Sequence, residues 1–256
     1  MNIDNYLKRI NYKGSLDPTA ETLKALHLAH MQAVPFENLS IHWQEPIILN
    51  EAALYDKIVN RQRGGFCYEL NGLFAALCQA LGFEVSKLSA RVSNGDGTFS
   101  PEFDHMTLLI TTGDGQERWL ADVGFGDSFR EPLLFASREM QAQYGCYYRL
   151  QQEDDAYFMS QKKEGEDWEA QYRFDLRPFQ FADYVPRCHF HQTSPDSHFQ
   201  RSKICSLATE NGRITLSDNR LITTTFDGSR TEMELRNRAV YAQTLKSEFG
   251  IIHPTI

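Results

Sequence analysis

Apolar residues recur at helical spacing after two adjacent glycines, Gly64 and Gly65. Their spacing predicts one buried face of an α-helix that ends before Gly82, a residue suited to the position where a helix stops. Cys67 then lies in the first turn, where unpaired backbone N–H groups and the helix dipole favour a thiolate. The two glycines leave room for another backbone or a substrate to come close. The apolar positions are Phe66, Leu70, Leu73, Phe74, Leu77 and Leu81.

The chain before this stretch also shows helical periodicity. Asp17 followed by Pro18 predicts a helix start, since aspartate caps helices and proline suits the first helical position. The run from Val34 to Leu39 interrupts the pattern, and Asn50 is suited to cap a further helix. We interpret two histidines of the pattern as surface residues or satisfied core residues. The residues at helical spacing are Leu23, Leu26, His27 and His30 in one helix and Leu54, Ile58 and Val59 in the other.

From residue 83 the apolar period changes to two, which predicts β-strands. Glycine-containing turns at residues 94–97 and 112–116 separate the first strands. Successive short strands joined by tight turns are typical of an antiparallel barrel or sandwich. The predicted strands span residues 83–92, 106–111, 117–123, 146–152, 156–162 and 167–175.

Prolines punctuate residues 177–203, and we predict that this stretch is irregular. Strands resume at residues 213–217, 220–226 and 230–234, and an amphipathic helix over residues 236–249 follows them. We predict that Val240, Leu245 and Phe249 face inward on this helix. The order of secondary structure is therefore helical, then β, then mixed.

The composition of the 256 residues, 41% hydrophobic and 23% charged, is that of an ordinary globular protein. A net charge of −8 without a basic patch argues against a nucleic-acid partner. No apolar run is long enough to span a membrane, and the N-terminus lacks the apolar stretch of a signal peptide. The five cysteines are irregularly spaced, which argues against a disulfide framework and favours a cytoplasmic location.

A cysteine nucleophile needs a base within hydrogen-bond reach and a group that orients the base. The hairpin around Asp114 supplies both, because His105 begins its outgoing strand and Asp122 ends its return strand. We predict a register in which paired residue numbers sum to about 227, so that the two side chains lie directly opposite on one face. The contact of this pair with Cys67 is not local, and sequence spacing alone does not establish it.

Five motifs in this order carry a family resemblance: Val34-Pro-Phe-Glu-Asn-Leu-Ser40, Arg63-Gly-Gly-Phe-Cys67-Tyr-Glu-Leu-Asn71, Asp104-His105-Met-Thr-Leu-Leu109, Trp119-Leu-Ala-Asp122-Val-Gly-Phe-Gly126 and Gln192-Thr-Ser-Pro-Asp-Ser-His-Phe199. The chain resembles the arylamine N-acetyltransferase family from about residue 5 to residue 250. The resemblance implies an α+β fold with a papain-like cysteine triad. Its three parts are a helical bundle with the cysteine (1–82), an antiparallel β-barrel with the histidine and aspartate (83–186) and a C-terminal α/β lid (187–256).

The resemblance also implies a ping-pong reaction. Acetyl-CoA, a co-substrate rather than a bound cofactor, loads an acetyl group onto Cys67, and a small arylamine or arylhydrazine then removes it. His105 pairs with the thiolate and later takes a proton from the amine, while Asp122 fixes the imidazole tautomer. The Cys67 backbone N–H is a candidate oxyanion donor. No metal is implied, and the resemblance leaves open whether the chain is a monomer or a homo-oligomer.

Further matched residues receive roles from the resemblance. In the family, the glutamate at Glu37 pairs with the arginine at Arg63, and we read this pair as support for the triad. Many bacterial members continue past the position of Ile256, so we assign no CoA contact to a C-terminal tail. The residues assigned to CoA are Gly124, Gly126, Thr193, Ser197 and Lys203, and those assigned to the aromatic walls of the acceptor pocket are Phe36, Phe125 and Phe199.

Several alternatives stay open on the sequence. The same triad serves an amide synthase or another N-acyltransferase, and it also serves a cysteine hydrolase. A non-catalytic binding module predicts that Cys67 is no more reactive than a free thiol. A zinc site is a further alternative, although the spacing of its residues matches no closed structural site. Those residues are Cys188, His189, His191, His198 and Cys205.

Overall fold

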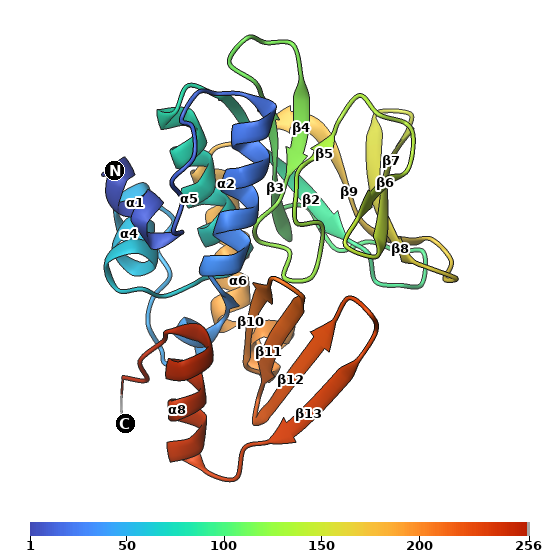
Figure 1. Ribbon diagram of the computed structural model, residues 1–256. Coiled ribbons are helices and arrows are strands. Elements are labelled where there is room, and N and C mark those ends of the chain that lie inside the picture. The colour runs from blue at the N-terminus through green and yellow to red at the C-terminus, as the bar shows by residue number, and fades with distance from the viewer. Residues whose placement is uncertain (255–256) are drawn as a thin grey trace.

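The computed structural model describes residues 1–254 and divides into three regions of different secondary structure (Figure 1). Helices from the first part of the chain stand beside a large curved sheet, and a smaller sheet with the last helix lies below both. The architecture is α+β, with a helical bundle, a barrel-like antiparallel sheet and an α/β lid. The predicted fold class is confirmed.

The helical region forms where the sequence predicts it, except that the helix predicted to start at Asp17 begins later. Thr19 rather than Asp17 caps α2, because the Thr19 side chain accepts a hydrogen bond from the Thr22 N–H. Asn50 caps α4 as predicted, and Gly82 follows α5 with a φ of 94°, the left-handed conformation that ends helices. The elements are α1 (Ile3–Arg9), α2 (Ala20–Ala33), β1 (Phe36–Glu37), α3 (Leu39–His42), α4 (Glu51–Tyr55), the π-helical turn η1 (Asp56–Asn60) and α5 (Cys67–Ala80).

The predicted inward faces of these helices form one hydrophobic core with the sheet. Residues of α2, α4 and α5 pack there against Leu108 and Ile110 of β3 and against Trp119 of β4. Both histidines of α2, His27 and His30, lie in this interior and are fully buried. The long helix α5 is therefore fixed along its whole length between the bundle and the sheet.

The large sheet has eight strands in the order β5-β4-β3-β2-β9-β8-β7-β6, and every neighbouring pair is antiparallel. A second core, built on aromatic and aliphatic residues, fills its concave side. The six predicted strands are confirmed, and β5 and β6 are additional. The strands are β2 (Glu84–Val92), β3 (His105–Thr111), β4 (Arg118–Ala121), β5 (Leu133–Leu134), β6 (Gln141–Gln143), β7 (Cys146–Glu153), β8 (Ala156–Lys163) and β9 (Glu169–Pro178).

The prediction that residues 177–203 are irregular is wrong. They contain α6 (Phe181–Thr193), in which Pro186 is internal, and α7 (His198–Arg201). Proline removes one backbone donor, but burial of Tyr184, Cys188 and His191 on one face of α6 outweighs that loss.

The lid combines a second antiparallel sheet with the last helix. Leu245 and Phe249 are buried as predicted, but Val240 is 41% exposed, because it lies about 140° around the helix from Leu245. Strand β1 joins this sheet through the pairs Phe36↔Ser206 and Glu37↔Cys205, so bundle and lid share a sheet. The lid elements are β10 (Ile204–Thr209), β11 (Gly212–Ser217), β12 (Arg220–Thr225), β13 (Arg230–Glu234) and α8 (Arg238–Phe249).

The division of the chain at residues 82 and 186 stays a prediction. Within residues 1–254, no helix combines the length and the apolar character that crossing a membrane requires.

Candidate active site

Cys67 is the first residue of α5 and is buried. The loop before it pairs with β1, because Glu37 N–H donates to the Gly65 carbonyl at 2.9 Å and Gly65 N–H donates to the Pro35 carbonyl at 3.3 Å. A Cβ at Gly64 would lie 1.9 Å from the Pro35 carbonyl oxygen, so only glycine permits this approach. The double glycine thus lets the loop lie against β1 and fixes where α5 begins.

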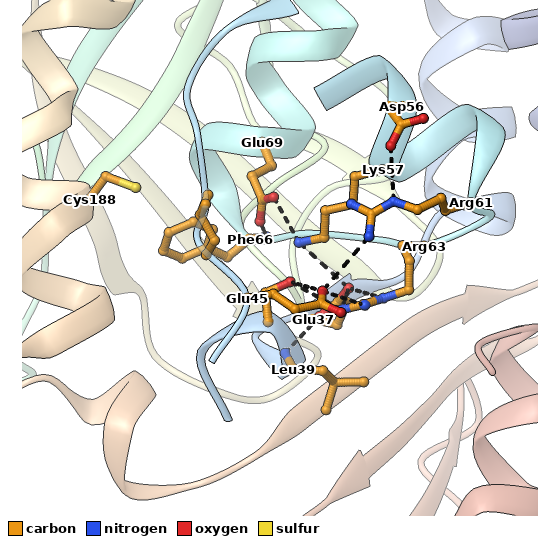
Figure 2. Close-up of polar contacts among 12 residues, drawn as sticks. Glu37, Leu39, Glu45, Asp56, Lys57, Arg61, Arg63, Phe66, Glu69 and Cys188 are labelled. Carbon is orange, nitrogen blue, oxygen red and sulfur yellow. Dashed lines mark hydrogen bonds and ion pairs between the residues drawn. The ribbon is translucent and has the colours of Figure 1, made fainter. Parts of the chain in front are cut away.

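A buried charge network supports the same loop (Figure 2). Arg63 Nε and Nη2 donate to Glu37 Oε1 at 3.0 and 2.8 Å, which confirms the predicted pair. Lys57 Nζ lies 2.7 Å from Glu69 Oε1 and 3.8 Å from Glu37 Oε1. Glu69 in turn accepts the Phe66 N–H at 3.1 Å, so its carboxylate caps the helix that Cys67 begins. Charges from α5, η1 and β1 therefore meet directly beneath the cysteine loop.

His105 and Asp122 meet on the β3–β4 hairpin, but in a different register from the predicted one. The observed pairs, such as Leu108↔Ala121 and Ile110↔Trp119, sum to 229 and not to 227. The loop holds four residues, and Thr112 N–H donates to the Glu117 carbonyl where the strands close. A shift of two keeps both side chains on one face and makes them diagonal neighbours. His105 Nε2 lies 2.6 Å from Asp122 Oδ2.

The Asp122 carboxylate is completely buried and has three donors. Besides His105, the Asn71 side-chain amide donates to Oδ1 at 2.8 Å and the Gly124 N–H donates to Oδ1 at 3.1 Å. Burial alone raises the pKa of this carboxyl, but the charge of His105 and these hydrogen bonds together hold the pKa below its ordinary value. Asp122 is therefore an anion in this site.

Two residues that the sequence did not single out hold the aspartate in place. His27 Nε2 accepts the Asp122 backbone N–H at 3.0 Å, and His27 Nδ1 donates to the Arg130 carbonyl at 2.7 Å. Asn71 accepts the Val123 N–H at 2.9 Å and donates to the Met106 carbonyl at 2.6 Å. Asn71 belongs to the motif that contains Cys67 and lies one helical turn after it, which could have indicated a role in the site. The helical spacing of His27 indicated only a surface position or a satisfied core position.

Cys67 adjoins both arms of the hairpin. A Cβ at Gly124 would lie 2.8 Å from the Cys67 Cα, so the loop after Asp122 runs directly over the cysteine. Burial raises the pKa of the Cys67 thiol, the charges of Asp122 and Asp104 raise it further, and a hydrogen bond from the Met106 backbone lowers it. Because Nε2 of His105 faces Asp122, Nδ1 is the nitrogen left for Cys67. The contact between the sulfur and this ring stays a prediction.

The predicted acceptor residues lie on two sides of this centre. The Phe125 ring packs edge-on against His105 and Tyr172, with centroids 5.1 Å apart in each case. Phe36 and Phe199 pack against each other at 6.3 Å, and the Cβ position of Gly126 lies 3.7 Å from the Phe36 ring. Aromatic side chains thus approach the hairpin from the loop after Asp122 and from the lid.

The three hydroxyl and lysine residues assigned to CoA have different surroundings. Thr193 is exposed at the end of α6 and donates to the His189 carbonyl at 2.8 Å. Ser197 is buried, and it accepts the Phe199 N–H at 3.3 Å. Lys203 lines a cavity of about 780 Å³ between α3, the β11–β12 turn and α8. Their role with CoA stays a prediction.

A smaller cavity of about 250 Å³ lies where the loop after Asp122 meets the lid and the barrel. The lining includes three arginines, Arg130, Arg213 and Arg230. It also includes two buried atoms that have no hydrogen-bond partner among the described residues, the Ser128 hydroxyl and the side-chain amide oxygen of Gln161. Burial lowers the pKa of Arg130 and the neighbouring charge of Arg213 lowers it further. Asp127 pairs with Arg213 at 3.1 Å, but the lining holds more cations than this one carboxylate balances, which favours an anionic ligand.

The zinc hypothesis gains no support from the geometry. Among residues 1–254, no three His, Cys, Asp or Glu side chains stand where they could share a metal ion. All five cysteines are free thiols in this part of the chain.

Comparisons with known proteins agree with this geometry. The model of an N-acetyltransferase family matches residues 19–253. An arylamine N-acetyltransferase of Escherichia coli is 35% identical over 84% of this chain and 76% of its own length. The structure of the Mycobacterium marinum arylamine N-acetyltransferase in complex with CoA superimposes with a TM-score of 0.89 at 32% identity, over 98% of this chain and 93% of that one. A proansamycin X synthase of Amycolatopsis mediterranei is 30% identical over 86% of each chain.

Proposed function

Because the chain belongs to the arylamine N-acetyltransferase family, whose members move an acetyl group from acetyl-CoA to arylamines, we propose that it performs this transfer by a ping-pong mechanism through an acetyl-Cys67 thioester. The position of Cys67 carries the proposal. It begins α5 against Gly124 and Met106, the neighbours of Asp122 and His105 along the chain. The nucleophile, base and orienting group of a cysteine triad thus come from one helix and one hairpin.

In the first half-reaction, His105 takes the proton of Cys67 and the sulfur attacks the acetyl carbonyl of acetyl-CoA. The bond from the carbonyl carbon to the CoA sulfur then breaks, and CoA leaves as a thiol with the proton from His105. The new thioester is no more stable than the donor thioester, so the acetyl group passes on readily. A buried thiol with a raised pKa needs this base, because without a cationic partner it stays protonated.

In the second half-reaction, the amine nitrogen attacks the acetyl carbon and His105 accepts the proton that the nitrogen loses. The bond to the Cys67 sulfur breaks, which restores the free cysteine and releases the N-acetyl product. Asp122 keeps the Nε2 proton of His105 directed at itself and stabilises the imidazolium at each step. The Cys67 N–H, at the start of α5, is the candidate donor to the developing oxyanion.

The arginine-lined cavity is our candidate for the phosphates of CoA. It adjoins the loop that carries Gly124 and Gly126, and its charge suits a pyrophosphate. The thioester end then reaches Cys67 along this loop, while the hydroxyl and lysine residues Thr193, Ser197 and Lys203 stay candidates for the remainder of the molecule. Phe36, Phe125 and Phe199 are the candidate aromatic walls for the arylamine.

The test is the intact mass of the protein after mixing with acetyl-CoA alone. We expect the gain of one acetyl group, its absence in Cys67→Ser, and its loss when a p-substituted aniline is added. No gain of mass in the wild-type protein, together with no turnover of anilines, would refute the proposed mechanism.

A second candidate is acyl transfer to or from other substrates on the same triad. The observation that favours it is the similarity to a relative named as a synthase rather than an acetyltransferase. Bulky acyl thioesters offered in place of acetyl-CoA test it: faster acylation of Cys67 by them than by acetyl-CoA would favour this second reading. Rapid hydrolysis of acyl-Cys67 without an amine would instead favour a hydrolase.

The proposed cellular location of the protein rests on its composition. The free thiols and the net charge of −8 support a cytoplasmic protein without a nucleic-acid or membrane partner. A subcellular fraction that held the protein outside the cytoplasm would contradict this proposal.

A further inference from the structure

The backbone just before His105 is strained. Phe103 has a φ of 64°, a left-handed conformation that is unfavourable for a bulky aromatic residue. Ser89 Oγ accepts the Phe103 N–H at 2.7 Å, and the Tyr68 hydroxyl donates to the Phe103 carbonyl at 2.6 Å. Such a conformation persists only where its surroundings hold it, and strain of this kind gathers at functional sites.

The strand end at His105 has few hydrogen bonds of its own. β3 pairs with β4 only over Leu108–Thr111, and with β2 its last pair is Ala90↔His105. Residues 105–107 therefore have a β neighbour on one side only. Sheet pairing alone does not fix the direction in which the His105 ring enters the site.

Asp104 supplies the missing support from a different element. Its carboxylate accepts a hydrogen bond from Arg187 Nε at 2.7 Å, and His191 Nε2 lies 3.1 Å from the same oxygen. Arg187 and His191 both lie on α6, one helical turn apart, so side chains from two positions of this helix contact the carboxylate. The Asp104 side chain is only 10% exposed, and a charge pair that is shielded in this way holds its geometry better than a surface pair.

His191 is itself held in one orientation. It is almost fully buried, and its Nδ1 lies 3.0 Å from the Ser197 hydroxyl at the start of α7. Nε2 lies 3.1 Å from Asp104 Oδ1, which is an ion-pair distance when the ring is protonated, but it forms no hydrogen bond among the described residues. The Ser197 hydroxyl oxygen also accepts the Phe199 N–H. The chain Ser197–His191–Asp104 thus connects the lid to the residue next to His105.

Tyr68 ties the same turn to the nucleophile. It follows Cys67 on α5, and its hydroxyl lies 3.2 Å from the Asp104 carbonyl in addition to its bond to Phe103. The turn before His105 is consequently held from α5 by Tyr68 and from α6 by the pair on Asp104. Those two helices carry the cysteine and the beginning of the lid.

We propose that Asp104, Arg187 and His191 are positioning residues that set the distance between the His105 ring and the Cys67 sulfur by anchoring the strained turn to α6. The inference rests on the proposed function, because it assigns these residues to the same triad. They touch no reacting atom and act through the position of His105, and the charge of Asp104 also raises the pKa of the Cys67 thiol. Because Arg187 and His191 lie on α6, where the lid begins, the distance between His105 and Cys67 also depends on the position of this helix.

The experiment compares Asp104→Asn, Arg187→Gln and His191→Gln with the control Arg177→Gln. Arg177 pairs with Glu102 just before the same turn, but its side chain is 63% exposed. We expect the three variants to lower kcat by about 100-fold, the effect of a base misplaced by about 1 Å, with KM for the arylamine unchanged within about twofold. Arg187→Lys should recover part of kcat, and the control should behave as wild type.

Two measurements separate this inference from its premises. Wild-type protein must gain an acetyl group on Cys67; if it does not, the proposed mechanism fails and not the positioning role. If the wild type is active, two results overturn the inference. One is that all three variants have the same kcat as Arg177→Gln, and the other is that their KM rises while kcat is unchanged. Melting temperature reports folding, and if Asp104→Asn does not fold, the partly exposed Arg187 variants decide the outcome.

Discussion

Asp122 is a buried anion whose donors come from three directions. His105 lies on the same hairpin, Asn71 lies on α5, and Gly124 lies in the loop that crosses Cys67. Each donor belongs to a segment that also touches another member of the site. The aspartate therefore positions the imidazole and also joins the helix to the hairpin.

Removal of the Asp122 charge tests its role toward His105. We expect Asp122→Asn to lower kcat by about 10⁴-fold, because an amide fails to hold the required tautomer and to stabilise the imidazolium. The measurement is steady-state acetylation of an aniline. An unchanged rate of Cys67 acetylation in the variant would show that His105 does not depend on this partner.

His27 predicts a pH dependence of stability. Burial lowers the pKa of His27 from 6.5 to about 4, so the residue stays neutral in the folded protein over a range where the unfolded chain binds a proton. Stability is complete above pH 6.5 and falls as the pH decreases toward 4, by about 3 kcal/mol in the free energy of unfolding.

Denaturant unfolding at several pH values measures this loss. His27→Gln lacks the titrating group, so its free energy of unfolding should change less between pH 7 and pH 4 than that of the wild type. The exposed His189→Gln is the control and should follow the wild type. Equal slopes in His27→Gln and wild type would contradict the assignment.

Among the elements, α5 is distinguished by buried charged side chains that stabilise its N-terminus. Lys57 is 5% exposed and stands between the carboxylates of Glu69 and Glu37. Because Glu69 also caps α5, the lysine neutralises the group that fixes the first turn of the helix. Arg61, on the same segment, pairs with Asp56 at the surface (Figure 2).

Loss of the lysine should be costly. We expect Lys57→Met to lower the free energy of unfolding by about 3–5 kcal/mol, because it leaves the buried Glu69 carboxylate without its cation, whereas Glu37 keeps Arg63. Arg61→Gln breaks an exposed pair and should cost less than about 1 kcal/mol. Chemical denaturation compares the two variants, and a similar small effect of both would show that Lys57 is not needed for charge balance.

Helix α6 shows how packing overrides a local signal. Pro186 and its neighbouring prolines predicted an irregular stretch, yet the segment is helical because Tyr184, Cys188 and His191 share one buried face. A single proline weakens a helix by about 3 kcal/mol, which several buried side chains offset.

At the scale of the whole molecule, bundle, barrel and lid meet around one loop. The loop after Asp122 passes Cys67 in the bundle, and Arg130 at its end donates to the Thr209 and Gly212 carbonyls of the lid. The arginine-lined cavity lies at this junction. A ligand there contacts barrel and lid together, so its binding should depend on their mutual position.

The cavity predicts a selective change in affinity. We expect Arg213→Gln to raise KM for acetyl-CoA by about 10-fold, the effect of losing a charged hydrogen bond to phosphate, and to leave KM for the arylamine unchanged. The exposed Arg220→Gln is the control. Equal KM values for acetyl-CoA in both variants would place the phosphates elsewhere.

The local pattern of residues was enough to predict most of the elements and the chemistry that each carries. The period of Phe66 to Leu81 set α5, and the change to a period of two set the hairpin with His105 and Asp122. These features are local: side chains a few residues apart share a face whatever the remainder of the chain does. The face of the hairpin was also predictable, although its register differs by two residues because the turn is centred between Asp114 and Gly115, one residue later than a sum of 227 requires.

How these parts meet depends on contacts between distant segments of the chain. His27 lies 95 residues before Asp122 in the chain, and Arg187 lies 83 residues after Asp104. No periodicity reports such pairs, since they form only when bundle, barrel and lid bury their faces against one another. Packing also placed Gly124 over Cys67 and turned the proline-containing segment into α6. The sequence named the reactive groups, and long-range burial fixed their distances.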